Sequence, residues 1–384
     1  MRRSGGVVGL LAPAVSWGLF WGGWAALLPG IKAELALTDQ QLGLSLFAIP
    51  VAAVPAMLLT GPLAHRLAQY TLPVVTAAFG VGVLLVGLAH SRAAFIGALL
   101  LIGASSGGVE VGLNATLAAQ EARDGRRLFN LVHSATPLAM VVAAPAAGLA
   151  RYLGASPEAV LTAISVLVGL SAVLAIDRRG WEEPASAATE RPRQMTGLLL
   201  MLGAVAAIAL LMENSVEQWG AIHLVQQLGA GPLIASFGPA AYMAGLSAGR
   251  MLAQWQGARL PDRTLVSIGG VLGGAGLAVG AAAWSVPWAV VGYAVAGGGL
   301  APVVPTLLSA VGRGIDPARR ARTISAVTTV SYAGFLVSPP LVGTLAGAVG
   351  LSAALGTVAA CGVLVAAGGQ LLRRLADGPT GGDA

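Results

Sequence analysis

The chain has 384 residues, of which 56% are hydrophobic and only 10% charged, with a formal net charge of +6. A soluble domain carries about a quarter charged residues, so a chain this long and this apolar could not cover itself with a water-compatible surface. Composition therefore predicts a polytopic membrane protein. The basic residues stand in short loops between apolar runs, and no nucleic-acid partner is expected.

Apolar runs of about 20 residues, the length that crosses a bilayer as a helix, follow one another along the chain. They predict an all-α membrane protein with twelve transmembrane helices, over residues 7–31, 39–63, 71–90, 93–119, 128–152, 157–177, 197–224, 231–256, 263–284, 286–311, 322–347 and 350–372. One long polar stretch separates two sets of six. We therefore expect an N-terminal six-helix bundle over 1–177, a cytoplasmic linker over 178–196 and a C-terminal six-helix bundle over 197–384.

Arginines cluster in alternate loops, and loops rich in lysine and arginine stay on the cytoplasmic side of a membrane. The loops on the other side hold only Lys32, Arg92 and Arg151. This asymmetry predicts a multi-pass protein with both termini in the cytoplasm.

The two halves of the chain align at a constant offset of 195 residues. The offset pairs Trp24 with Trp219, Gly103 with Gly298, Glu121 with Asp316, Arg127 with Arg322, Pro145 with Pro340 and Gly148 with Gly343. Because six spans is an even number, the two halves insert in the same orientation. Parallel repeats of this kind are the architecture of a large class of secondary transporters.

The loop after the second span, "GPLAHRLAQY" (61–70), resembles the signature G-x-L-A-D-R-x-G-R of the major facilitator superfamily. The matching positions are Gly61, Leu63, Ala64 and Arg66, whereas His65 stands in place of the usual aspartate. "AAPAAG" (143–148) is a reduced form of the glycine–proline motif of the fifth span. The resemblance extends over nearly the whole chain and implies the twelve-helix major facilitator fold.

Two further stretches resemble a bacterial subgroup near the fucose permeases. Residues 107–138, beginning "GGVEVGLN", are similar to its segment G-x-x-D/E-V-x-x-N … H-x-x-x-x-x-G. "ENSVEQWGAIHL" (213–224) is similar to E-G-x-x-x-D-W-S-A-x-Y-L, with Gln218 in place of the acidic residue. The resemblance implies a bacterial cytoplasmic (inner) membrane protein in which the first, fourth, seventh and tenth spans line a central cavity.

Glu110 lies near the middle of the fourth span, with Asn114 one turn later on the same face. An ionisable group at the membrane centre costs about 2.5–3.5 kcal/mol on insertion scales, so such residues are usually functional. Glu110 is therefore a candidate proton carrier, and Asn114 a candidate substrate contact. A structural hydrogen bond between helices is the alternative for Glu110. The fucose permeases also have an acidic residue in this span, which is linked to proton coupling.

Glu213 and Glu217 share one face of the seventh span, with Asn214 and Gln218 beside them. Glu213 is the stronger candidate for proton coupling, since Glu217 lies nearer the outer interface and could simply be solvated. Asn214 and Gln218 are candidate substrate ligands. The other half carries no acidic residue at the matching positions, which fits a single off-axis coupling site.

Two of the four histidines and one arginine are further candidates in the spans. His133, early in the fifth span, is a candidate proton relay, or it bonds a backbone carbonyl as a neutral ring. His223, at the end of the seventh span, is expected at the membrane interface. Arg250 is either the inner end of the eighth span or a buried partner for a carboxylate.

Trp17, Trp21 and Trp24 form one stripe along the first span. Trp17, Trp21 and the repeat-related Trp219 are candidate substrate contacts by ring stacking. The alternative is packing, and Trp24 and Trp219 could instead belong to an outer aromatic belt. At the cytoplasmic side, Arg66, Arg127 and Arg322 are candidate gating residues through contacts between the two halves.

These features predict a proton-coupled secondary active transporter, a symporter or antiporter, that works by rocker-switch alternating access as a monomer. Its expected partners are protons, the lipid bilayer and a small organic solute, with a sugar-like polar solute favoured. Proton-driven efflux of drugs or hydrophobic metabolites is the alternative, and a non-transporting membrane receptor is the rival from another class. The sequence contains no G-x-x-x-x-G-K-[ST] loop, no H-E-x-x-H and only one cysteine, so neither a cofactor, a metal site nor enzymatic activity is expected.

Overall fold

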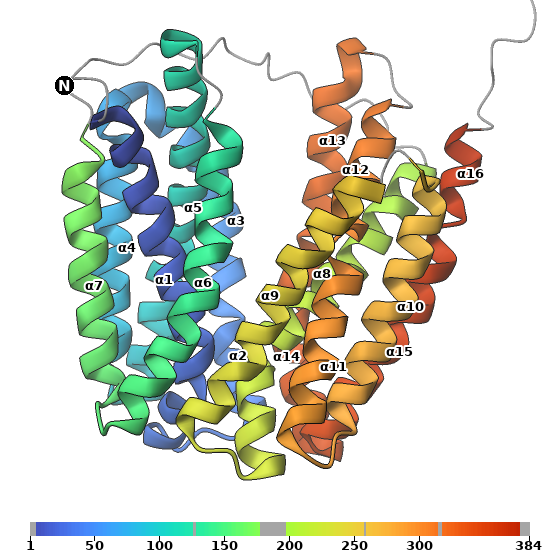
Figure 1. Cartoon of the computed structure of the whole chain (residues 1–384). Coiled ribbons are helices and arrows are strands. Elements are labelled where there is room, and N and C mark those ends of the chain that lie inside the picture. The colour runs from blue at the N-terminus through green and yellow to red at the C-terminus, as the bar shows by residue number, and fades with distance from the viewer. Residues whose placement is uncertain (1–4, 126–127, 177–196, 257–258, 314–316, 377–384) are drawn as a thin grey trace, which may run out of the picture. The chain divides into compact units, whose positions relative to one another are not determined.

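The structure of the chain, a computed structural model, describes residues 5–125, 128–176, 197–256, 259–313 and 317–376. Every regular element within these ranges is a helix, which confirms the all-α prediction (Figure 1). Eleven helical segments of the described chain are long and apolar enough to cross a membrane. A further long helix, α9 (Pro232–Gln256), occupies the position of the predicted eighth span.

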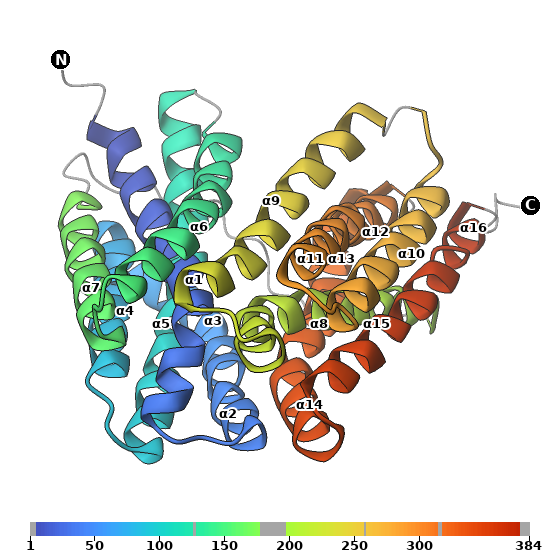
Figure 2. The ribbon, with the colours of Figure 1, turned by 60° about the horizontal axis from the view of Figure 1, so that its bottom comes forward.

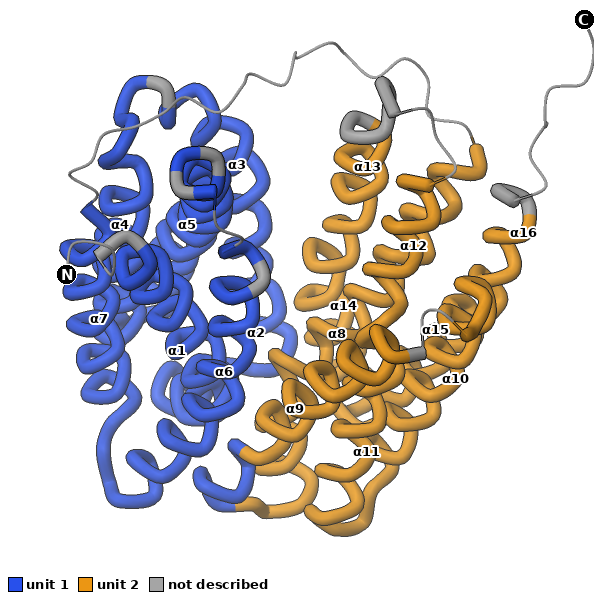
Figure 3. The backbone as a smooth tube through the Cα atoms, turned by 45° about the horizontal axis from the view of Figure 1, so that its top comes forward, with its two compact units in different colours: residues 1–188, 231–236 blue, residues 189–230, 237–384 orange. Residues whose placement is uncertain are grey.

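The chain divides into two compact units, residues 1–188 with 231–236 and residues 189–230 with 237–384 (Figure 3). Before the segment 177–196, the helices are α1 (Gly5–Glu34), α2 (Asp39–Leu46), α3 (Ala48–Leu67), the short 3-10 helix η1 (Ala68–Tyr70), α4 (Thr71–Gly87), α5 (Arg92–Asp124), α6 (Phe129–Tyr152) and α7 (Pro157–Leu174). After it they are α8 (Gly197–Leu228), α9, α10 (Asp262–Ala281), α11 (Val286–Leu300), α12 (Val303–Arg313), α13 (Pro317–Ser331), α14 (Ala333–Val349), α15 (Leu351–Gly368) and α16 (Leu371–Ala376). The linker predicted at 178–196 lies outside the described residues.

Three predicted spans are broken helices, at residue 47, at residues 301–302 and at Tyr332 between α13 and α14, and a proline explains the first two breaks. Proline has no N–H and its ring clashes with the carbonyl four residues earlier. Pro50 therefore disturbs the carbonyl of Leu46, where α2 ends, and α3 begins two residues later. Pro302 likewise separates α11 from α12. Sequence analysis expected one continuous helix in each place.

In the first unit, α1 lies beside α6 and α7, and α4 lies between α5 and α7 (Figures 1 and 2). The core holds fully buried rings: Phe20 meets Phe79 edge-on at 5.0 Å, and Trp24 stacks on Phe95 at 6.2 Å. Trp24 is only 1% exposed. This burial excludes the aromatic-belt alternative for Trp24, since a belt residue faces the lipid headgroups.

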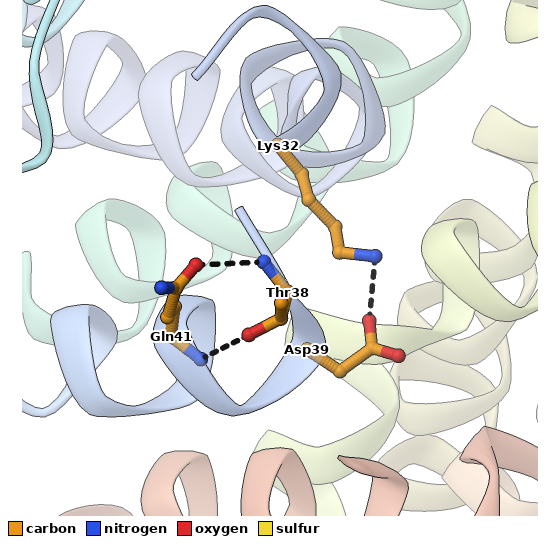
Figure 4. A network of polar contacts seen from close by, with 4 residues as sticks. All are labelled: Lys32, Thr38, Asp39 and Gln41. Carbon is orange, nitrogen blue, oxygen red and sulfur yellow. Dashed lines mark hydrogen bonds and ion pairs between the residues drawn. The ribbon is translucent and has the colours of Figure 1, made fainter. Parts of the chain in front are cut away.

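The turn from α1 to α2 is held by polar contacts from both sides (Figure 4). Lys32 forms an ion pair of 2.7 Å with Asp39 in the first turn of α2. Thr38 and Gln41 exchange hydrogen bonds of 3.1 and 3.0 Å in a capping box, which satisfies two free backbone N–H groups at the start of α2. These contacts fix the direction in which the chain re-enters the membrane.

In the second unit, α8 lies against α14 and α15, and α10 lies between α11 and α15. Small residues at the contacts allow these helices to approach one another closely. The hydroxyls of Ser215 and Ser338 are 3.1 Å apart and join α8 to α14. A methyl group on Gly270 would lie 2.7 Å from the Gly362 carbonyl, so α10 and α15 are in backbone contact.

The sequence repeat is matched by equivalent helix crossings in the two units. In the first unit, a methyl group on Gly103 of α5 would collide with the carbonyl of Ile49 on α3. In the second, a methyl group on Gly245 of α9 would collide with the carbonyl of Ala294 on α11. The offset of 195 residues relates α3 to α9 and α5 to α11. A methyl group on Gly297 of α11 would likewise collide with the carbonyl of Tyr242 on α9, so the same pair of helices crosses at backbone contact in both units.

Candidate functional site

Two helices of the second unit, α8 and α9, place four ionisable side chains near one another. They pack closely where Gly238 faces Gly220: a methyl group on Gly238 would lie 3.5 Å from the backbone of Gly220. The helices are joined by a short connection and run antiparallel, so each turn along α9 meets the preceding turn of α8. Tyr242 lies one turn beyond Gly238 on α9, and the α8 carboxylates Glu213 and Glu217 act on it electrostatically.

Glu213, Glu217, Tyr242 and Arg250 form what we call the acidic cluster. Both carboxylates are half-buried, Tyr242 is 0% exposed, and Arg250 is exposed. Arg250 acts electrostatically on both carboxylates, and both carboxylates act on Tyr242. Arg250 is thus neither the end of α9, which continues to Gln256, nor a buried side chain, and its role as a partner for a carboxylate stays a prediction. Glu217 is half-buried, as Glu213 is, one turn further along α8.

Tyr242 is the member of the acidic cluster that sequence analysis missed. The only signal was a polar ring in the apolar run "AAYMAGLSAGRM", and its orientation toward α8 depends on tertiary packing. Its hydroxyl group has no hydrogen-bond partner within the described part of the chain. A buried hydroxyl without a partner is rare in proteins and needs an explanation.

The predicted substrate contacts next to the cluster are buried within the second unit. Asn214 is 7% exposed, Gln218 6% and Trp219 0%. Asn214 Oδ1 and Trp219 Nε1 have no hydrogen-bond partner among the described residues. Full burial excludes the belt alternative for Trp219, as it does for Trp24 in the first unit.

His223 forms a second polar group in this unit. Its Nδ1 lies 2.9 Å from the hydroxyl of Tyr293 on α11, and its Nε2 lies 3.0 Å from the hydroxyl of Ser352 on α15. The ring is 0% exposed, so His223 faces neither lipid nor water. Its partner Ser352 is the second residue of α15, so the ring lies near a helix end, as expected. α8 continues beyond the predicted end of its span to Leu228, and His223 thus lies inside the helix, where it joins three helices of the unit.

In the first unit, the structure brings two predicted residues together. Asn114 Oδ1 on α5 and His133 Nε2 on α6 are 2.9 Å apart, in a hydrogen bond. Phe129 stacks on the His133 ring at 5.2 Å, with an angle of 19° between the planes. His133 is exposed, and Glu110 is half-buried one turn before Asn114. The side-chain partner of His133 is thus an amide on a neighbouring helix.

The three tryptophans of the α1 stripe lie in different environments. Trp17 Nε1 donates a 3.0 Å hydrogen bond to Ser106 Oγ on α5, and its ring is half-buried. Trp21 is also half-buried and meets Phe20 edge-on at 5.0 Å. Both rings therefore keep some accessible surface, whereas Trp24 has almost none.

The predicted gating arginines are described only in part. Arg66 is exposed on α3, Arg127 lies outside the described residues, and Arg322 lies on α13 with its side chain not described. The same side of the first unit holds a contact that sequence analysis missed. A carboxylate oxygen of Glu121 accepts hydrogen bonds from the backbone N–H groups of Leu128 and Phe129, the latter at 2.8 Å. Glu121 therefore caps α6 from the end of α5.

No protein-family model matches the chain. An uncharacterized MFS-type transporter of Yersinia pestis is 30% identical to it over 369 residues, which cover 93% of this chain and 93% of the relative. The chain belongs to the MFS-type transporters. Membrane protein MosC of Rhizobium meliloti is 26% identical to this MFS-type chain over 357 residues, with 91% of this chain and 86% of MosC covered.

Solved structures share the fold. A bacterial homolog of the human lysosomal transporter Spinster, in an inward-facing and occupied conformation, matches with a TM-score of 0.77 at 14% identity over 95% of this chain and 96% of that chain. The nucleoside transporter NupG matches with a TM-score of 0.77 at 12% identity over 97% of this chain and 100% of that chain. The protein is thus an integral membrane transporter of the major facilitator type, and its relatives are transporters rather than enzymes. The resemblance to the fucose permease subgroup stays a prediction.

Proposed function

We propose that this MFS-type protein is a proton-coupled secondary active transporter of a small organic solute. The observation that carries the proposal is the pair of half-buried carboxylates, Glu213 and Glu217, on the membrane-spanning helix α8 beside Arg250. An ionisable residue within a membrane span is costly and usually marks an ion pathway or a proton relay. Glu110 on α5 is a further carboxylate of this kind, in the other unit.

The proposed mechanism is rocker-switch alternating access, in which the two six-helix repeats alternately expose a site near the midplane. Protonation of a carboxylate removes a charge that the membrane interior disfavours, so the loaded site can change its exposure at lower cost. His133, hydrogen-bonded to Asn114, is the proposed relay next to Glu110. We place the protein in the bacterial inner membrane, as a monomer with both termini in the cytoplasm.

A sugar-like polar solute is the favoured substrate class, because amide, carboxylate and indole groups supply the hydrogen bonds and ring faces that such a solute needs. The candidate contacts are Trp17, Trp21, Asn114, Asn214, Gln218 and Trp219. The half-buried Trp17 and Trp21 also suit a hydrophobic compound, and proton-driven efflux is the second candidate function. Arg66, Arg127 and Arg322 are the proposed gating residues, and the subgroup near the fucose permeases is the proposed relation within the superfamily.

The experiment is solute-driven proton movement in liposomes that contain the purified protein and a trapped pH-sensitive dye. Sugars, nucleosides and hydrophobic cations are added in turn, with and without an imposed pH gradient. The wild type is expected to move protons with one class of solute, and Glu110→Gln or Glu213→Gln to lose this movement. Solute flux that ignores the pH gradient, and that both variants carry at full rate, would overturn the proposal.

A further inference from the structure

The first turns of α6 are joined to α5 by a continuous set of contacts within the first unit. Phe129 and His133 stand four residues apart, so their rings share one face of α6. The two rings are stacked, with centroids 5.2 Å apart and 19° between their planes. On α5, Asn114 Oδ1 lies 2.9 Å from His133 Nε2, and Glu121 accepts a 2.8 Å hydrogen bond from the Phe129 N–H. The His133 ring is thus held by a hydrogen bond at its edge and by an aromatic ring on its face.

The partner of His133 determines which nitrogen of the neutral ring carries the hydrogen. An amide oxygen only accepts hydrogen bonds, so Nε2 is the donor to Asn114 and holds the hydrogen. The lone pair of the neutral ring is then on Nδ1. His133 is exposed, and Nδ1 has no hydrogen-bond partner within the described part of the chain. Proton exchange can therefore take place at Nδ1 while Nε2 stays bonded.

The same two contacts also suit the charged ring. An imidazolium donates from both nitrogens, so the bond from Nε2 to the Asn114 oxygen persists when Nδ1 takes up a proton. The face of an aromatic ring such as Phe129 attracts a cation within about 6 Å. A carboxylate in place of Asn114 would favour the charged ring, whereas a neutral amide lets the ring gain and lose a proton. The ring keeps one orientation through both states, as a reversible relay requires.

The charged groups around His133 come from α5, as far as the chain is described. They are Glu110, one turn before Asn114, and Glu121 and Arg123 at the end of the helix. α1, which packs along α6, has no ionisable side chain before its last turn. α7 carries only Glu158, in its first turn, beside the other end of α6. Glu110 is thus the proposed proton carrier on the helix that holds the ring.

We infer that Nδ1 of His133 is the atom that takes up and releases the coupled proton, and that Asn114 and Phe129 are positioning residues for the ring. The proton leaves an O–H bond of the Glu110 carboxyl group or of water and forms an N–H bond at the Nδ1 lone pair. It is later released to water from the same atom. This inference rests on the proposed proton coupling. It adds Phe129 to the residues that coupling requires, and Asn114 gains a role through His133.

Nitrogen NMR of the purified full-length protein with labelled histidine tests the tautomer. The chain has four histidines, and His133→Gln identifies which signals belong to His133. The neutral ring of the wild type is expected to carry its hydrogen on Nε2 and to bind the titrating proton at Nδ1. Asn114→Ala is expected to populate both neutral tautomers. A neutral wild-type ring with its hydrogen on Nδ1, or a ring that Asn114→Ala leaves unchanged, would overturn the inference.

Transport tests the role of Phe129, with a mixture of sugars, nucleosides and hydrophobic cations as the probe in liposomes. Phe129→Leu is expected to slow pH-driven transport about threefold, the factor that corresponds to one exposed contact of a cation with a ring. Solute exchange at equal pH on both sides is expected to keep its rate, because Phe129 acts only through His133. Phe129→Tyr keeps a stacking ring and is expected to restore pH-driven transport.

Tyr152→Leu is the matched control, since Tyr152 is an exposed aromatic residue at the other end of α6. Its pH-driven transport is expected to equal that of the wild type. The melting temperatures of Tyr152→Leu and Phe129→Leu are expected to be similar, as for two surface substitutions. If Phe129→Leu slows exchange as much as pH-driven transport, or slows neither, Phe129 does not position the relay and the inference fails.

Failure of this inference can be distinguished from failure of proton coupling. If solute flux ignores the pH gradient, the proposed function fails whichever tautomer His133 adopts. If the wild type couples solute to protons but His133 carries its hydrogen on Nδ1, or Phe129→Leu transports as the wild type does, proton coupling stands and the inference fails.

Discussion

The two units of this transporter treat their polar side chains differently. In the first unit, Trp17 is hydrogen-bonded to Ser106 and Asn114 to His133. In the second unit, buried polar atoms of Tyr242, Asn214 and Trp219 have no partner among the described residues. The first unit also has such an atom, Thr76 Oγ1 on α4, but in the second unit three of them lie on two neighbouring helices, α8 and α9. Buried polar groups without a partner are rare, so this part of the second unit differs from an ordinary helix–helix contact.

The largest expected effect on transport comes from removing the two acidic side chains of α8 in the second unit. The double variant Glu213→Gln/Glu217→Gln is expected to reduce pH-driven transport about a hundredfold, as for loss of an essential proton-transfer group. Asn114→Ala/His133→Ala in the first unit is expected to reduce it less, since it removes a relay and leaves Glu110 in place. Initial rates in liposomes would measure both. If the glutamate variant lost less transport activity than the first-unit variant, proton coupling would depend more on the first unit than on the second.

The second prediction concerns the helix crossings that the units share. Gly103→Ala and Gly245→Ala place a methyl group against backbone carbonyls, which cannot move aside as a flexible side chain could. Each is expected to lower the free energy of unfolding by about 1–3 kcal/mol, the usual cost of overpacking. Melting temperature in detergent is the measurement.

Matched controls exist for both glycine variants. No atom lies within 4 Å of a methyl group placed on Gly97 of α5 or on Gly356 of α15. Gly97→Ala and Gly356→Ala are therefore expected to be neutral or stabilising. If Gly103→Ala is as harmless as Gly97→Ala, the close α3–α5 crossing does not stabilise the first unit as the α9–α11 crossing does the second.

The third prediction compares a buried hydrogen bond with an exposed one. Tyr293→Phe leaves the buried Nδ1 of His223 without its partner and is expected to cost about 1–3 kcal/mol. Asn114→Ala leaves His133 exposed and free to bond water, at an expected cost within about 0.5 kcal/mol. Thermal unfolding of both variants provides the measurement. Equal losses would show that the Asn114–His133 bond is as structural as the His223–Tyr293 bond.

The smallest effect is expected at the start of α6. Glu121→Ala removes the acceptor for the Leu128 and Phe129 N–H groups and is expected to cost about 1 kcal/mol, as for loss of a helix cap. Glu121→Gln keeps an oxygen acceptor and should retain most of that stability. Hydrogen exchange of these two amides is the measurement. Unchanged protection in Glu121→Ala would exclude the capping role.

Sequence analysis predicted the class and the helices because both depend on local composition. Uninterrupted apolar runs have no other stable form in a membrane than helices, and the family prediction is confirmed by the relative from Yersinia pestis. The breaks at Pro50 and Pro302 also have a local cause and could have been anticipated from proline alone. The roles of the candidate site residues stay predictions.

The errors concern the direction in which a side chain points. α8 is apolar on most of its circumference, and its sequence does not indicate which face meets α9, α11 or α14. His223 was therefore expected at the interface, although it is enclosed by α11 and α15. Tyr242 was overlooked for the same reason, since only packing buries it and brings it under the influence of Glu213 and Glu217.

The sequence by itself thus determined that this is a membrane protein, where its helices lie and that its two halves are repeats. These properties follow from hydrophobicity, helix length and proline, each of which depends on only a few neighbouring residues. Only the tertiary structure joined Glu213 and Glu217 to Tyr242 and Arg250, because that grouping depends on how α9 is rotated against α8. The close contact of Gly238 with Gly220 is one of the places where the two helices meet, and no local pattern in the sequence identifies it.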